Sequence, residues 1–185
     1  LTKPLGTGVG RSAEKMALMQ PQHRGLLGRE LARLNANAAR LGLQAGARCA
    51  TDVTGFGLAG HGLEMARASG ARLRFDFARL PSYSWFEHYW AAGARTKVTA
   101  ANRELVGDRL VTSGPLREVD FDLICDPQTS GGLLMAVPAE QAEELAERLA
   151  DGGDEYARVV GEVVVGAVVV GGDVAASHLT KPEDA

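Results

Sequence analysis

The chain has only two cysteines, Cys49 and Cys125, among its 185 residues. Two distant cysteines cannot form the disulfide framework of a small secreted domain, and they do not have the spacing of a zinc site. No apolar run approaches the roughly 20 residues that span a membrane, and residues 1–10 lack a basic region followed by an apolar one. We therefore expect a soluble, cytoplasmic protein with no membrane partner and with both thiols buried.

Aromatic residues are also scarce, at 5% of the chain. Proteins that bind single strands of nucleic acid need aromatic side chains on which bases stack, and duplex-binding proteins concentrate Lys and Arg on one surface. Here the arginines are spread along segments with helical periodicity, and the net charge is −3. This pattern argues against nucleic acid as a partner.

The rest of the composition is that of an ordinary globular protein, with 45% hydrophobic and 23% charged residues. A chain of this length can bury a core of its own. We expect one domain over residues 1–175 and a frayed tail over residues 176–185.

Hydrophobic periodicity predicts an α+β fold, in which helices pack on a mixed β-sheet. The predicted helices cover residues 21–41, 58–69 and 139–150. The predicted strands cover residues 47–53, 73–77 and 131–137, with one or two more within 159–170. Residues 1–10 are too rich in glycine to predict a helix, and residues 81–118 indicate helical turns and long loops around an aromatic cluster that serves packing.

The segment Ala50–His61 places a carboxylate, Asp52, at the end of a predicted strand and follows it with a glycine turn that opens a helix. Glycines let backbone N–H groups approach an anion, a helix amino-terminus favours negative charge, and a carboxylate can hold Mg²⁺ against phosphate. A tight turn capped by Asp52 explains the same residues without a ligand.

The segment Cys125–Gly132 is a second run of hydrogen-bonding groups, and it directly precedes a predicted strand. Pro127 restricts its backbone, and two glycines end it. The run suits a binding loop or a contact with another domain, and it equally suits a turn that leads into the strand.

Histidine and cysteine give no clear catalytic group. His61 lies near a helix start but has no partner at i+4, and the other histidines have no companions either. Cys125 has no lysine or histidine nearby in the sequence to lower its pKa, which favours an inert buried thiol. We therefore predict no catalytic residue in this chain.

Three segments together resemble the carboxy-terminal half of the selenophosphate synthetase (selenide, water dikinase) family, within the aminoimidazole ribonucleotide synthetase-like superfamily. They are the segments LTKPLGTG at 1–8, TDVTGFGLAGH at 51–61 and CDPQTSGGLL at 125–134. Their order is that of the family, and the resemblance covers nearly the whole chain.

The resemblance implies the family's α+β carboxy-terminal domain, acting with an amino-terminal ATP-binding domain that is absent from this sequence. Such an enzyme converts ATP, selenide and water to selenophosphate, AMP and phosphate with Mg²⁺, and in full-length form it is a homodimer. The missing domain supplies the nucleophile, a lysine and several aspartates, so the isolated chain should be inactive. The metal ligand carried over is Asp52. The nucleotide-binding residues carried over are Thr51, Thr54, Gly55, Gly57, Asp126, Gln128, Thr129 and Ser130.

The sequence departs from the family pattern at Arg95–Asn102, where the family has a glycine-rich Gly-Gly-Thr-x-Arg-Asn run and only Asn102 matches.

Two alternatives to this function stay open. One is a sister ATP-dependent enzyme of the same superfamily, and the other is a non-catalytic interaction or dimerisation domain.

Overall fold

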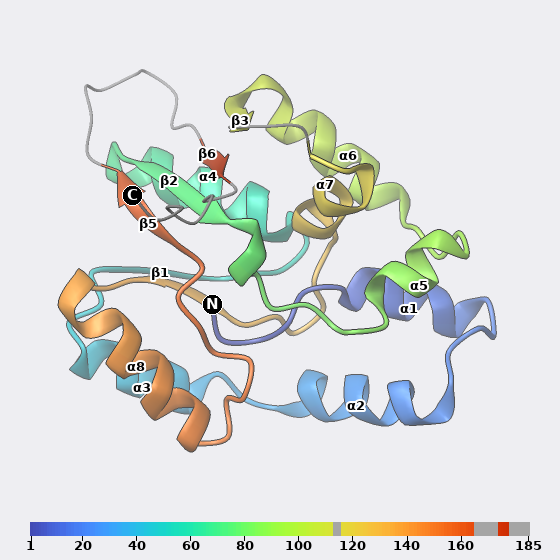
Figure 1. Ribbon diagram of the computed structural model, residues 1–185, viewed down its shortest axis with the longest axis horizontal. Coiled ribbons are helices and arrows are strands. Elements are labelled where there is room, and N and C mark those ends of the chain that lie inside the picture. The colour runs from blue at the N-terminus through green and yellow to red at the C-terminus, as the bar shows by residue number, and fades with distance from the viewer. Residues whose placement is uncertain (113–115, 165–173, 178–185) are drawn as a thin grey trace, which may run out of the picture.

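The computed structural model describes residues 1–112, 116–164 and 174–177. Helices are the more numerous elements among these residues, and strands form two small sheets (Figure 1). The helices are α1 (Thr7–Lys15), α2 (Pro21–Ala32), α3 (Ala36–Gln44), α4 (Gly57–Ser69), α5 (Phe86–Ala91), α6 (Lys97–Val106), α7 (Glu118–Cys125) and α8 (Ala139–Asp151). The strands are β1 (Cys49–Asp52), β2 (Arg72–Asp76), β3 (Leu110–Thr112), β4 (Leu133–Ala136), β5 (Gly161–Val164) and β6 (Val174–Ser177).

The strands confirm the predicted α+β class with a mixed sheet. β1 and β4 pair antiparallel, and the larger sheet has the order β3-β6-β2-β5. In this sheet β2 runs antiparallel to β5 but parallel to β6, which in turn is parallel to β3. The expected domain boundary at residue 175 falls inside β6, and the predicted strand residues 165–170 lie outside the described part of the chain.

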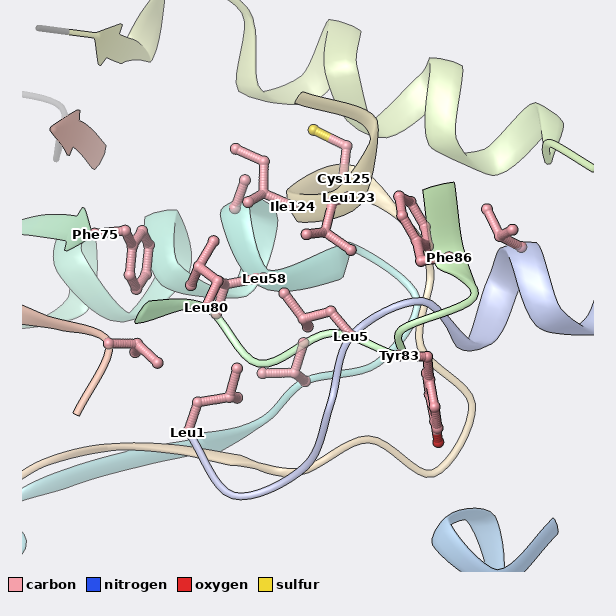
Figure 2. Packing of buried hydrophobic residues seen from close by; sticks show 14 of the residues in the cluster. Leu1, Leu5, Leu58, Phe75, Leu80, Tyr83, Phe86, Leu123, Ile124 and Cys125 are labelled. Carbon is pink, nitrogen blue, oxygen red and sulfur yellow. The ribbon is translucent and has the colours of Figure 1, made fainter. Parts of the chain in front are cut away.

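Helices pack against these sheets and against one another. α4 packs against β1 and β2 on one side and against α6 and α7 on the other, whereas α3 lies beside α8 at the opposite end of the molecule (Figure 1). The main core joins α1, α4, α5 and α7, and Figure 2 shows Leu5, Leu58 and Leu123 within it. Burying one such side chain contributes about 1.5–3 kcal/mol. No helix among the described residues is long and apolar enough to cross a membrane.

Local signals predicted several elements correctly. β2 alternates half-buried and buried side chains, as its period-two pattern requires. α4 ends at Gly70, which has the left-handed conformation of a helix cap at φ 58°. The aromatic cluster is packing, because Tyr83, Trp85 and Tyr89 are each no more than 3% exposed.

The predicted helix over residues 21–41 is wrong in one respect, because the chain breaks it into α2 and α3. Arg33 takes an extended backbone, and its guanidinium pairs with Glu30 and Asp154. Asn35 donates to the carbonyl of Gly131 at 2.9 Å. These contacts with distant residues outweigh the local helical periodicity, which alone cannot reveal them.

The prediction of no helix within residues 1–10 is also wrong, because α1 begins at Thr7. A Cβ at Gly8 would lie 2.5 Å from Oδ1 of Asp126, so the glycine allows the helix to approach this carboxylate. The hydrogen bonds made there offset the low helix propensity of glycine. α7 was likewise missed, although Val119 and Leu123 are buried at the i, i+4 spacing of a helix.

Candidate functional site

The two glycine-containing segments of the sequence lie side by side. β1 pairs with β4 so that Asp52 is opposite Leu133. The pairing continues past the strand ends, where the N–H of Val53 donates to the carbonyl of Gly132 at 2.9 Å and the N–H of Gln128 donates to that of Thr54 at 2.9 Å. The structure therefore joins the predicted turn after Asp52 to the loop before Leu133, and we call these two segments the paired loops (residues 52–57 and 126–132).

The exposed members of the paired loops are candidates for direct ligand contact. Asp52 and Gly55 are exposed on one loop, as are Thr129 and Ser130 on the other. Thr51 is half-buried, and its hydroxyl donates to the carbonyl of Asp52 at 3.2 Å. Carboxylate, hydroxyl and backbone groups are therefore available together at the end of β1.

The glycine turn is fixed tightly against the end of α7. Gly57 has φ 68°, and a Cβ there would lie 2.7 Å from the carbonyl oxygen of Ile124. Asn102 of α6 donates from Nδ2 to the carbonyls of Gly55 and Cys125, at 2.8 and 2.9 Å. Asn102 thus connects the turn to α7. The sequence pointed to this residue only as a retained match of the family pattern.

Asp126 and Gln128 lie in the interior rather than at the surface. The Asp126 carboxylate accepts from the N–H groups of Gly8 and Val9, at 2.8 and 3.1 Å, and from Nε2 of Gln128 at 3.1 Å. Oε1 of Gln128 accepts from the N–H groups of Gly6 and Thr7. These two predicted site residues therefore cap the amino-terminus of α1. The sequence alone did not predict this role, because the residues in contact are about 120 positions apart.

The environment of Asp126 opposes its ionisation. Burial raises the pKa of its carboxyl to about 7, although the hydrogen bonds from Gly8, Gln128 and Val9 act in the other direction. The carboxyl is fully covered by protein, at 0% exposure. Asp126 therefore fixes the loop at residues 126–132 through buried hydrogen bonds.

His61 has two polar partners. Its Nε2 lies 3.1 Å from Oγ1 of Thr54, and its Nδ1 lies 3.1 Å from Oε2 of Glu64. The spacing i, i+4 considered in the sequence does not reveal either partner, because Glu64 is at i+3 and Thr54 precedes the helix.

The two thiols differ in burial. Cys125 is fully buried, as predicted, and burial raises its pKa to about 12. Cys49 is half-buried rather than buried, so that part of the prediction is wrong.

The fit to a divalent cation is partial. Within the described residues no three His, Cys, Asp or Glu side chains gather as a metal cluster. Asp52 supplies one exposed carboxylate, which matches the way Mg²⁺ is held in nucleotide sites, by one or two carboxylates together with phosphates and waters. The paired loops therefore offer one ligand of such a site.

A separate hollow of about 560 Å³ lies between β2, β4 and α8. Its lining is mostly apolar and includes Leu73, Met135 and Leu149. None of the predicted site residues lines it, so the residue chemistry favours the paired loops as the functional site.

Comparison with known proteins agrees with the motifs. The chain is 46% identical over 147 residues to the selenide, water dikinase of Bordetella bronchiseptica, covering 79% of this chain and 42% of that protein. It is 43% identical over 164 residues to the selenide, water dikinase of Escherichia coli K12, covering 89% and 46%. The chain thus spans less than half the length of these curated relatives.

Solved structures support the fold alone. Hydrogenase maturation protein HypE matches with a TM-score of 0.62 at 17% identity, covering 88% of this chain and 42% of that chain. Thiamine-monophosphate kinase from Stenotrophomonas maltophilia matches with a TM-score of 0.54 at 20% identity, covering 94% of this chain and 48% of that chain.

The family profile of the AIR synthase related protein, C-terminal domain, matches residues 1–173. The chain therefore belongs to the family of AIR synthase-related carboxy-terminal domains.

Proposed function

We propose that this chain is the carboxy-terminal part of an ATP-dependent selenophosphate synthetase. The observation that carries the proposal is the pairing of the Asp52 turn with the Thr129–Ser130 loop, in a chain 43–46% identical to proteins named selenide, water dikinase. In this proposal the whole protein converts ATP, selenide and water to selenophosphate, AMP and phosphate.

The paired loops act by positioning and charge neutralisation. Phosphoryl transfer depends mainly on holding the phosphates in place and compensating their charge. Asp52 would hold Mg²⁺, and the bound ion would supply positive charge that compensates the phosphates. Thr51, Thr54, Gly55, Gly57, Thr129 and Ser130 shape the surface that meets the phosphates, while Asp126 and Gln128 fix the second loop from the interior. The bond-breaking groups belong to the remainder of the protein, so this chain alone should be inactive.

The proposed partners and location follow the same reading. This chain and the amino-terminal domain bind ATP and selenide jointly. The full-length protein is a homodimer in the cytoplasm, with no nucleic acid or membrane partner. A sister activity of the superfamily is less favoured, because the curated relatives cited above are named selenide, water dikinase. A non-catalytic interaction domain is less favoured for the same reason, since those relatives are named as enzymes.

The experiment measures AMP formation from ATP and Mg²⁺, with and without selenide, by the longer protein that contains this chain. Wild type should need selenide, and Asp52→Asn should lose most of the activity. Asp151→Asn, at an exposed position on α8, is the matched control and should behave as wild type. Selenide-independent activity, or an Asp52→Asn variant as active as the control, would contradict the proposal.

A further inference from the structure

Three side chains form a row of hydrogen bonds behind the glycine turn. Thr54 Oγ1 contacts Nε2 of His61 at 3.1 Å, and Nδ1 of His61 contacts Oε2 of Glu64 at 3.1 Å. His61 and Glu64 are neighbours on one face of α4, at i and i+3. The row therefore links an exposed carboxylate to a hydroxyl of the paired loops through one imidazole.

The protons of this row can be placed by elimination. An ionised carboxylate only accepts hydrogen bonds, so the contact with Glu64 requires the proton on Nδ1 of His61. Both nitrogens of an imidazolium would donate, so this placement applies to the neutral imidazole. With its proton on Nδ1, the neutral ring has a lone pair on Nε2. Thr54 must then donate its one hydroxyl proton to Nε2, and only the lone pairs of its oxygen remain for a ligand.

We propose that His61 is a positioning residue of the paired loops: oriented by Glu64, it takes the Thr54 hydroxyl proton and presents the Thr54 oxygen as an acceptor. A phosphate oxygen needs donors, whereas the waters around a divalent cation donate. Thr54 belongs to the same loop as Asp52, and we assign its oxygen to the hydration shell of a cation held there. The identity of this ligand rests on the proposed function, but the direction of the Thr54 hydrogen bond does not.

The surroundings hold the imidazole in place. His61 is 8% exposed, and the centroids of its ring and the Phe56 ring are 5.4 Å apart. The backbone carbonyl of Thr54 accepts from the N–H groups of Gly57 and Gln128, which fixes the residue that carries the hydroxyl. Glu64 is 59% exposed at its side chain, so it is the member of the row that can be replaced without opening the core.

The first test is ¹⁵N NMR of the full chain with labelled histidines at pH 7.5, with the His61 signals assigned by their absence in His61→Gln. We expect a protonated Nδ1 and an unprotonated Nε2 at His61. Glu64→Ala should shift His61 toward a mixture of tautomers, whereas Glu147→Ala, at an exposed glutamate of α8, should leave its signals unchanged. A proton on Nε2 in wild type, or a Glu64→Ala spectrum identical to wild type, would overturn the inference.

The second test measures the Mg²⁺ dependence of the longer protein. Loss of a residue that contacts a metal ligand typically weakens metal affinity about 10–100-fold. Glu64 acts through His61 and Thr54, so Glu64→Ala should raise the half-saturating Mg²⁺ concentration by less, about two- to tenfold, with a smaller effect on kcat. His61→Gln retains a carbonyl acceptor and should be closer to wild type than His61→Ala. If Asp52→Asn changes the Mg²⁺ requirement but Glu64→Ala does not, the positioning role is wrong. If Asp52→Asn changes nothing, the proposed metal ligand fails while the NMR result still decides the inference.

Discussion

The substitution Asp126→Asn tests whether the loop at residues 126–132 is built around a buried helix cap. Oδ2 of Asp126 accepts from Gly8 and Gln128, and Oδ1 accepts from Val9. An asparagine can place its one oxygen at the Oδ2 position, but its amide then faces the N–H of Val9. One buried donor and the new amide group are left without acceptors. Because each such group costs about 1–3 kcal/mol and removal of a buried charge offsets part of this, we expect a net loss of about 2–4 kcal/mol.

The assay is urea unfolding at pH 8, where the carboxyl is mostly ionised, followed by circular dichroism. Asp151→Asn is the matched control, because an exposed substitution away from contacts changes stability by about 0.5 kcal/mol or less. An Asp126→Asn variant as stable as this control would contradict the helix-cap role. It would mean that the hydrogen bonds of the carboxylate with Gly8, Val9 and Gln128 contribute no net stability.

The other predictions concern the turn, the pH dependence and the thiols. Gly57→Ala should lower the free energy of unfolding by about 2–5 kcal/mol in the same assay, because the residue has positive φ and the new Cβ overlaps α7. Gly70→Ala is the control, since Gly70 has positive φ but open space around it, and it should cost about 1–2 kcal/mol. Equal losses would contradict the packing of the turn. Between about pH 4 and 7 native Asp126 binds more protons than the unfolded chain, so its contribution to stability falls as pH rises through that window, and Asp126→Asn should flatten this slope; an unchanged slope would count against it. Iodoacetamide at pH 8 should modify Cys49 but reach Cys125 only after unfolding, and mass spectrometry of native Cys125 carrying the label would disprove its burial.

Local signals predicted the parts of the fold that depend on short-range chemistry. The period-two pattern of β2 and the apolar periodicity of α8 lie within single segments, as does the αL glycine that ends α4. The mixed sheet and the α+β class followed from such segments. The glycine turn after Asp52 was predicted for the same reason, since Gly57 does take positive φ at the first position of α4.

The errors came from contacts between distant residues. α1 depends on Asp126 and Gln128, and the break between α2 and α3 depends on Asp154 and Gly131. No pattern within either segment carries that information. The same limit explains the candidate site, because the sequence supplied both loops but neither their adjacency nor the interior position of Asp126.

The proposed function is tested most directly by ³¹P NMR of the products that the longer protein forms from ATP, Mg²⁺ and selenide. Wild type should form selenophosphate, AMP and phosphate in equal amounts, and Asp52→Asn should form none of the three. Formation of ADP with a different phosphorylated product, or turnover without selenide, would contradict it.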